Sequence, residues 1–262
     1  MVTNMYQIEN DYMDLAQIAD SGQCFRWKKI DENTYEIPMV DQTVTVTQEK
    51  NKFTFSCDEQ EFNEIWRSYF DLDTDYGDII SKIDKSDIFL YDSATYGKGI
   101  RILRQDFWEM VVSFVISQNN NIPRITKSIQ ALCDKYGRFP TPELLLNTDV
   151  DDFRKMGLGY RAEYMGNIAR FFLELEENPV THFSGMDYDG AMQELMSIKG
   201  IGKKVANCVC LFGLYYITAC PIDTWMKKII EEEYNGDIPA WMQGEYAGIY
   251  QQYTFYRKRM KK

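Results

Sequence analysis

The sequence predicts an α+β protein, in which a small antiparallel β-sheet domain precedes an all-helical region. Two observations predict this class. Short segments with alternating β-branched and aromatic residues lie in the first 85 or so positions. From about residue 90, apolar residues instead recur between helix-capping and helix-breaking signals. We therefore predict a β-rich N-terminal domain over 1–88 and a helical region over 89–262.

The N-terminal domain is expected to contain strands at 35–37, 44–47 and 53–55, because each alternates with period two. Polar residues at 31–33 and 49–52 predict the turns beside these strands. One or two helices should follow in about 60–83.

The helical region begins with a capping box, Asp106 and Glu109, ahead of a continuous apolar segment at 110–116. Pro123 suits the first turn of the next helix, which should end near Gly137. The remaining signals are a helix start at Thr141, a break at 157–159, the end of a long helix at Pro179, a helix at 191–196 and a last helix at about 245–257.

The composition is that of an ordinary globular protein, with 45% apolar and 26% charged residues. No apolar run is long enough to cross a bilayer and the N-terminus has no secretion signal, so we expect a cytoplasmic protein, nucleoid-associated if prokaryotic. The net charge of −11 argues against indiscriminate nucleic-acid binding, although a local basic face would suffice for a specific site. The basic residues of the second half could form such a face or be scattered, solvated charges.

The six cysteines contain no C-x-x-C pair and no zinc pattern, and His182 is the single histidine. A histidine-based metal site is therefore not expected. Reduced and mostly buried thiols are the simpler interpretation.

The most informative segment is a glycine hairpin between two helices, expected within 191–214. Gly200 and Gly202 allow a tight turn, and the amides of the following helix N-terminus favour a phosphate. Lys203 and Lys204 open that helix. A lysine attacks only through its unprotonated amine, which burial or a neighbouring cation favours. Lys204 could be such a nucleophile, or both lysines could merely hold phosphates.

Asp223 is predicted to cap a further helix, which ordinarily contributes about 1 kcal/mol. Its carboxylate could also stabilise the positive charge that develops at an anomeric carbon when a glycosidic bond breaks. Asn119, Asn120 and Arg124 could read base edges or form a polar turn. Gln251 and Phe255 share a helical face and could form a base pocket or belong to the core.

Several ordered motifs resemble the 8-oxoguanine DNA glycosylases of the helix-hairpin-helix superfamily. They extend over most of the chain, and they occupy 21–27, 69–73, 102–106, 119–122, 157–162, 198–208, 221–223 and 246–248. The resemblance implies a DNA glycosylase and abasic-site lyase of base excision repair. It further implies a Schiff base on Lys204, with Asp223 as the essential carboxylate.

The resemblance also assigns a pocket and a DNA-binding surface. The carbonyl of Gly22 would accept the N7 hydrogen of 8-oxoguanine, Cys208 and Phe255 would sandwich the base, and Gln251 would read its edge. The residues implied at the unpaired cytosine are Asn119, Arg124 and Arg161, with Asn120 lining the gap and Tyr160 as the wedge. The residues implied at the DNA phosphate are Gly200, Gly202 and Lys203, with the backbone carbonyls of Met196, Ile198 and Ile201 holding Na⁺ or K⁺.

The chain departs from the family pattern at Trp225, where many relatives carry a histidine that contacts the lesion phosphate. Residues 231–250 are also short, so few positions support the alignment of the C-terminal pocket. No four-cysteine cluster follows Asp223, which argues against the iron–sulfur branches of the superfamily. We therefore expect no iron–sulfur cluster and no organic or redox cofactor.

The predicted function is excision of 8-oxoguanine, preferably opposite cytosine, by a monomer acting on double-stranded DNA without a membrane partner. One alternative is an abasic-site lyase or glycosylase for another lesion. Another is a non-catalytic helix-hairpin-helix DNA-binding module, which would need the hairpin and its cations but not Asp223.

Overall fold

A computed structural model describes residues 5–261, and it contains two compact units. The first unit combines Met1–Arg104 with Ile217–Lys262, and the second is Gln105–Tyr216. The first holds the sheet and the last helices of the chain, whereas the second is helical. The predicted α+β class, with an N-terminal antiparallel sheet, is confirmed.

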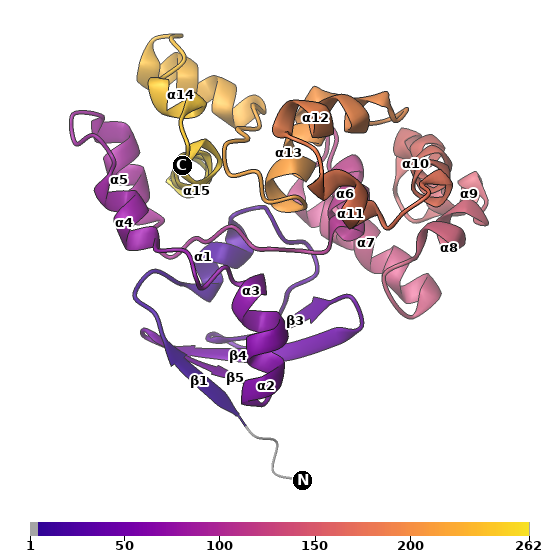
Figure 1. The fold of residues 1–262 in the computed structure, drawn as a ribbon, viewed down its shortest axis with the longest axis horizontal. Coiled ribbons are helices and arrows are strands. Elements are labelled where there is room, and N and C mark those ends of the chain that lie inside the picture. Colours follow the sequence, from indigo (N-terminus) through magenta and orange to yellow (C-terminus); the bar gives the residue numbers. More distant parts are fainter. Residues whose placement is uncertain (1–4, 262) are drawn as a thin grey trace. The chain divides into compact units, whose positions relative to one another are not determined.

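The sheet of the first unit has five antiparallel strands in the order β1-β5-β4-β3-β2 (Figure 1). The predicted strand segments lie in the three central strands, where Val46 pairs with both Tyr35 and Phe55. The sequence did not reveal the edge strands, because one has only two residues, both exposed, and the other is half-exposed along its length. The strands are β1 (Tyr6–Glu9), β2 (Lys28–Lys29), β3 (Thr34–Met39), β4 (Gln42–Glu49) and β5 (Lys52–Phe55).

A continuous helical stretch, α2 (Glu59–Glu61), η1 (Phe62–Trp66) and α3 (Arg67–Tyr69), crosses the sheet (Figure 1). Alternate strand residues such as Val46 and Phe55 are fully buried and share one core cluster with Trp66 of η1. Period-two burial on the strands therefore meets an apolar helical face. The other helices of this unit are α1 (Leu15–Asp20), α4 (Tyr76–Ser81), α5 (Ile88–Tyr96), α14 (Thr224–Tyr234), η3 (Ala240–Gln243) and α15 (Ala247–Met260).

The C-terminal helices pack with the N-terminal part of the chain. Tyr250 of α15 donates its hydroxyl to the Ile79 carbonyl at 3.0 Å, and Arg257 donates to the Phe89 carbonyl at 3.1 Å. The compact units consequently do not follow the division predicted at residues 88 and 89, which as a domain boundary stays a prediction.

The second unit confirms most of the predicted helix signals. Asp106 accepts the Glu109 amide at 2.8 Å, and Gly137 ends a helix with φ +70°. The prediction for Pro179 is wrong: the long helix ends at Glu174, and Pro179 instead opens a short helix, where its missing N–H costs nothing. The helices are α6 (Phe107–Ile116), α7 (Ile122–Tyr136), α8 (Pro142–Leu146), α9 (Val150–Lys155), η2 (Gly159–Arg161), α10 (Ala162–Glu174), α11 (Pro179–Ser184), α12 (Tyr188–Ser197) and α13 (Lys203–Phe212).

None of the six cysteines forms a disulfide, and four of them are buried. Burial raises the pKa of Cys210 and Cys220 to about 12, so these two thiols stay protonated and unreactive at neutral pH. Within residues 5–261, no helix combines the length and the apolar character needed to span a bilayer.

Candidate active site

The predicted hairpin joins α12 to α13, and its geometry requires glycine at the turn. Gly200 has φ +110°, and a Cβ there would lie 2.4 Å from Cγ of Tyr164. The Ile201 amide donates to the Ile198 carbonyl at 3.0 Å and closes the turn. Gly202 is the N-cap of α13 and its backbone is extended. The free amides of the α13 N-terminus therefore follow directly from a turn that only glycine can make.

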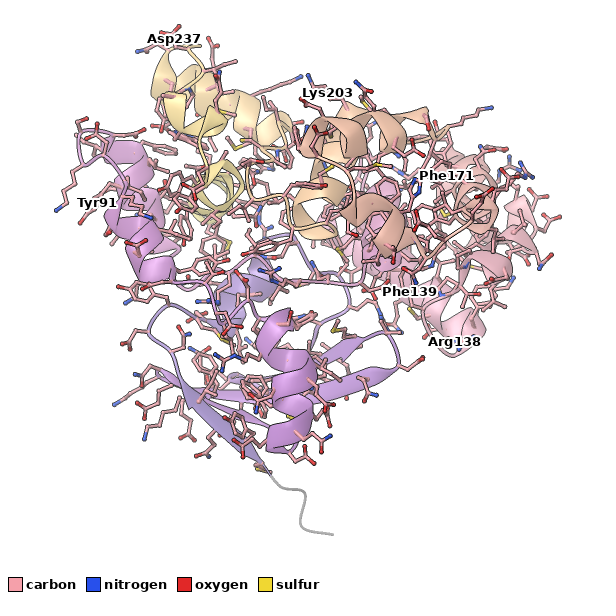
Figure 2. The ribbon with its side chains drawn as sticks, viewed as in Figure 1. Tyr91, Arg138, Phe139, Phe171, Lys203 and Asp237 are labelled. Atoms are coloured by element: carbon pink, nitrogen blue, oxygen red, sulfur yellow. The ribbon has the colours of Figure 1, made fainter. Side chains whose placement is uncertain are left out.

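Lys204 lies in the first turn of α13, partly buried, with Nζ 5.7 Å from the centroid of the Phe114 ring. Phe114 in turn stacks on Phe212 at 5.3 Å. The amine thus stands over aromatic carbon, whereas Lys203 is exposed at the surface (Figure 2). Cys208 follows Lys204 by one helical turn and is buried, so both lie on one face of α13.

A polar loop after α6 is tied to the hairpin. Gln118 donates Nε2 to the Gly200 carbonyl at 2.9 Å, and its own carbonyl accepts from Nε of Arg161 at 2.7 Å. Asn119, with φ +46°, donates Nδ2 to the Tyr160 hydroxyl at 3.1 Å. The structure therefore brings together the hairpin, two of the residues predicted at the unpaired cytosine, Asn119 and Arg161, and the predicted wedge Tyr160.

Arg161 is only 5% exposed, and its guanidinium donates to backbone carbonyls. Besides the bond to Gln118, it donates to Leu158 at 3.1 Å and to Asn119 at 3.0 Å, and it lies 4.6 Å from the Tyr160 ring centroid. In this structure Arg161 thus clamps the loop that carries Asn119. Its contact with an unpaired base stays a prediction.

The other two residues of the predicted DNA surface occupy helix ends. Asn120 donates Nδ2 to the Ile116 carbonyl at 3.1 Å, which satisfies the C-terminus of α6. Arg124 lies in the first turn of α7, with an exposed side chain, and its amide donates to Oδ1 of Asn121 at 3.1 Å. The loop 117–121 is therefore ordered by its own amides as well as by Arg161.

In the first unit, Asp223 is the predicted N-cap of α14. Its Oδ1 accepts from the amides of Trp225 and Met226, both at 2.9 Å, so the cap does not need Oδ2. Met226 also ties α14 to α15, since the Thr254 hydroxyl lies 3.8 Å from its sulfur and 2.9 Å from the Gln251 carbonyl. Asp223 therefore begins a helix that packs against the segment carrying Gln251 and Phe255.

Gly22, in the same unit, has φ +82° and lies between two buried polar side chains. Gln23 donates Nε2 to the Arg101 carbonyl and accepts the Leu103 amide, both at 2.9 Å. Ser21 donates its hydroxyl to the Ile18 carbonyl at 2.7 Å. These bonds fix the backbone around the Gly22 carbonyl.

Sequence reasoning missed the supporting roles of Gln23 and Arg101. The Arg101 guanidinium is 1% exposed and donates to the carbonyls of Phe70, Asp71 and Thr74. A glutamine directly after the proposed pocket glycine was the available signal for Gln23. Arg101 gave no signal, because its partners are about 30 residues away in the chain.

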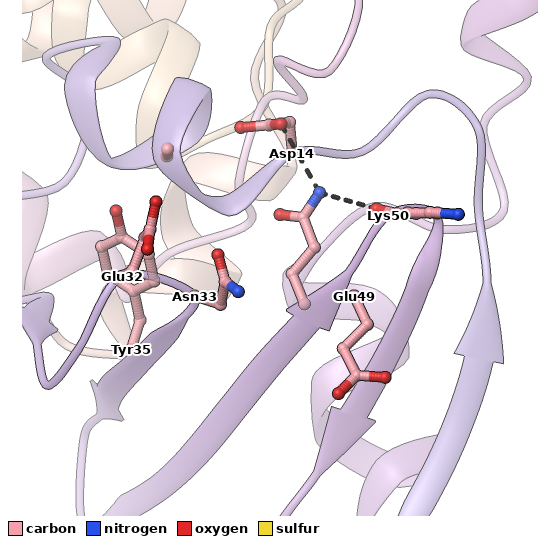
Figure 3. Close-up of a pocket in the computed structure, with 8 residues that line it drawn as sticks. Asp14, Glu32, Asn33, Tyr35, Glu49 and Lys50 are labelled. Carbon is pink, nitrogen blue, oxygen red and sulfur yellow. Dashed lines mark hydrogen bonds between the residues drawn. The ribbon is translucent and has the colours of Figure 1, made fainter.

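Clusters of metal ligands and surface hollows are the other places where a site could lie. Among residues 5–261, no group of three or more His, Cys, Asp or Glu side chains could hold a metal ion. A hollow in the first unit, where Gln48 bridges Asp14 and the Lys50 carbonyl, contains no predicted site residue (Figure 3).

The backbone carbonyls proposed for a monovalent cation surround the hairpin turn. The Ile198 carbonyl accepts from the Ile201 amide and keeps a second lone pair, which a cation could use.

The hairpin between α12 and α13, with helix amides and a lysine at its exit, is the helix-hairpin-helix element of one superfamily of base-excision DNA glycosylases. Residues 5–111 match the family described as "8-oxoguanine DNA glycosylase, N-terminal domain", and 112–237 match the "HhH-GPD superfamily base excision DNA repair protein". The chain belongs to the 8-oxoguanine DNA glycosylase family, which confirms the predicted family and enzyme class.

Individual relatives agree. The "N-glycosylase/DNA lyase" of Saccharomyces cerevisiae is 30% identical, over 87% of this chain and 70% of the yeast protein. MBOgg1 with a low-affinity DNA ligand superposes with a TM-score of 0.91 at 34% identity, covering 98% of this chain and 96% of that one. The Clostridium acetobutylicum 8-oxoguanine glycosylase/lyase, with double-stranded DNA containing cytosine opposite 8-oxoG, gives 0.88 at 31% identity and 98% coverage of both chains.

Proposed function

We propose that this chain removes 8-oxoguanine opposite cytosine from duplex DNA and then cuts the abasic strand through a Schiff base on Lys204. The observation that carries the proposal is the position of Lys204, in the first turn of α13 directly after a glycine-dependent hairpin, in a member of this family. The hairpin amides would hold a phosphate beside the lesion while the damaged nucleotide is flipped out of the stack.

The chemical steps follow from the residues. The neutral Lys204 amine attacks C1′ of the sugar, and the bond from C1′ to the base breaks with its electron pair going to the base, which takes up a proton. Asp223 stabilises the positive charge that develops on the sugar. The sugar ring then opens to an imine on Lys204, and loss of a C2′ proton expels the 3′ phosphate.

The remaining roles belong to the same proposal. Gly22, Cys208, Gln251 and Phe255 form the base pocket. The residues at the DNA backbone and the unpaired cytosine are Asn119, Asn120, Arg124, Tyr160, Arg161, Gly200, Gly202 and Lys203. The carbonyls of Met196, Ile198 and Ile201 hold a monovalent cation. The enzyme needs no iron–sulfur cluster, and it acts as a cytoplasmic monomer.

The test is incubation with an 8-oxoguanine:cytosine duplex in the presence of borohydride. We expect a covalent protein–DNA adduct and a single-strand cut, both absent with an undamaged duplex. Free-base release without any adduct would contradict the Schiff base and leave only the glycosylase step.

A second candidate is a lyase or glycosylase with a different or broader range of lesions. Trp225 favours it, because this indole, 5.7 Å from Nζ of Lys228, stands where many relatives carry a histidine that contacts the lesion phosphate, so that contact with the damaged nucleotide would differ in this chain. Comparable rates on an abasic site and on 8-oxoguanine would support this candidate.

A further inference from the structure

Gln251 is followed on α15 by a second buried glutamine to which the proposed function gives no role. Gln251 is 4% exposed and Gln252 is 3% exposed. Nε2 of Gln252 donates to Oε1 of Gln251 at 3.0 Å. Because Phe255 lies three residues beyond Gln252 and four beyond Gln251, these residues are neighbours on the helix surface.

We propose that Gln252 is a positioning residue that fixes the orientation of the Gln251 carboxamide and thereby the class of purine that the pocket accepts. The proposal rests on the proposed function for the statement that Gln251 reads the base edge. It goes beyond that function by naming the residue that fixes which end of the Gln251 carboxamide faces Gln252.

The physical argument starts from the asymmetry of a primary amide, which has an acceptor oxygen at one end and a donor nitrogen at the other. If Gln251 alone turned by 180°, its N–H groups would face the N–H groups of Gln252. The bond between them therefore holds the oxygen end of Gln251 toward Gln252. The Gln251 oxygen has a second lone pair, and its nitrogen has two donors, so both ends can still contact a base.

The fixed amide matches one kind of purine edge. An oxopurine such as 8-oxoguanine presents N1–H as donor next to O6 as acceptor, and a carboxamide can pair with both. An aminopurine such as 8-oxoadenine presents N1 as acceptor next to N6–H as donor, and it requires the opposite amide orientation. A fixed Gln251 consequently discriminates between the two, whereas a freely turning one accommodates either.

Burial leaves one atom of the amide pair without a hydrogen-bond partner. Oε1 of Gln252 is buried and has no hydrogen-bond partner among the described residues. If both amides turned together, Gln251 would donate to this oxygen, but the Gln252 nitrogen would then occupy the position without a partner, so the turned pair would have an unpartnered donor in place of an unpartnered acceptor. The observed orientation leaves the donors of Gln251 available for O6 of an oxopurine, at the cost of one unsatisfied acceptor.

The experiment compares excision of 8-oxoguanine and 8-oxoadenine, in one duplex context opposite cytosine, by the parent and two variants. Gln252→Leu removes the donor and frees Gln251 to turn. Gln252→Glu offers only acceptors, so it draws the Gln251 nitrogen toward residue 252 and reverses the orientation. Gln243→Leu, at an exposed position of η3, is the matched control.

We expect the 8-oxoguanine to 8-oxoadenine rate ratio to fall about tenfold in Gln252→Leu and further in Gln252→Glu, and to stay at the parent value in Gln243→Leu. The ratio is the informative quantity, because a loss of folded protein lowers both rates equally. An unchanged ratio in the two Gln252 variants overturns the proposal.

A second measurement does not depend on the reaction. In the free protein, a side-chain amide proton of Gln252 should exchange slowly with solvent, and this protection should be lost in Gln251→Leu. Equal exchange in the two proteins also overturns the proposal. A parent that fails to excise 8-oxoguanine but shows the protected proton would refute the proposed function and leave the amide pair standing.

Discussion

The two units place their site residues by different physical means. In the second unit, a buried guanidinium, that of Arg161, holds an exposed loop by donating to backbone carbonyls. In the first unit, neutral buried amides are the direct supports of Gly22 and Gln251, whereas the buried Arg101 guanidinium holds carbonyls farther along the chain. Charge-assisted bonds are the stronger kind and tolerate a partly solvated surface, whereas neutral amides depend on burial for their strength. The comparison shows that a charged donor holds the exposed loop of Asn119, whereas neutral donors hold the backbone beside Gly22 and the side chain of Gln251.

The largest expected effect separates chemistry from binding in the second unit. Lys204→Gln should reduce base excision by roughly 10³-fold or more and abolish borohydride trapping, because the nucleophile is lost. DNA binding should remain, since only one of several cations is removed. Gel-shift and single-turnover assays should be run beside Lys203→Gln, whose exposed lysine should affect binding alone. A trapped adduct formed by Lys204→Gln at the parent rate would identify another amine as the nucleophile.

The next effect tests the carboxylate of the first unit. Asp223→Asn should reduce excision by roughly 10²–10³-fold, because the charge that stabilises the developing sugar cation is lost. Asparagine is as good an N-cap as aspartate, so thermal melting should change little. Melting and single-turnover excision should be measured on one preparation. If both are unchanged, Asp223 is a helix cap only.

Two glycine-to-alanine variants test whether the hairpin turn requires glycine. Gly200→Ala should cost about 1–3 kcal/mol of stability, since φ +110° is unfavourable for alanine and its Cβ would meet the Tyr164 ring. Gly166→Ala lies inside α10, where a Cβ meets nothing within 4 Å, and should instead stabilise by about 1 kcal/mol. Urea unfolding of both variants measures the difference. Equal effects would mean that the turn does not depend on glycine.

The smallest expected effect concerns the Arg161 clamp. Arg161→Lys should lower the preference for cytosine over adenine opposite the lesion by about tenfold. The Arg161 guanidinium donates to the carbonyls of Leu158, Gln118 and Asn119 together, and the single ammonium of lysine cannot replace it. Asn119 would therefore lose its fixed position. Arg170→Lys, exposed on α10, is the matched control. If the preference for cytosine over adenine is unchanged in Arg161→Lys, the bonds that Arg161 makes to the loop do not contribute to opposite-base specificity.

Local signals in the sequence were sufficient for the features that depend on neighbouring residues. The caps at Asp106 and Asp223, the stop at Gly137 and the turn at Gly200 lie where they were predicted, because capping and turn geometry is decided within a few residues. Pro179 was misassigned because proline suits the start of one helix as well as the region after another.

By itself, the sequence determined the fold class, the hairpin with Lys204 at its helix start, and the cap at Asp223. Only the tertiary structure decided that α14 and α15 pack with the N-terminal unit, that Arg161 clamps the loop of Asn119, and that Gln23 and Arg101 support the backbone near Gly22. The physical reason is that an apolar face or a buried donor must find a partner, but its own sequence does not specify which distant segment supplies it.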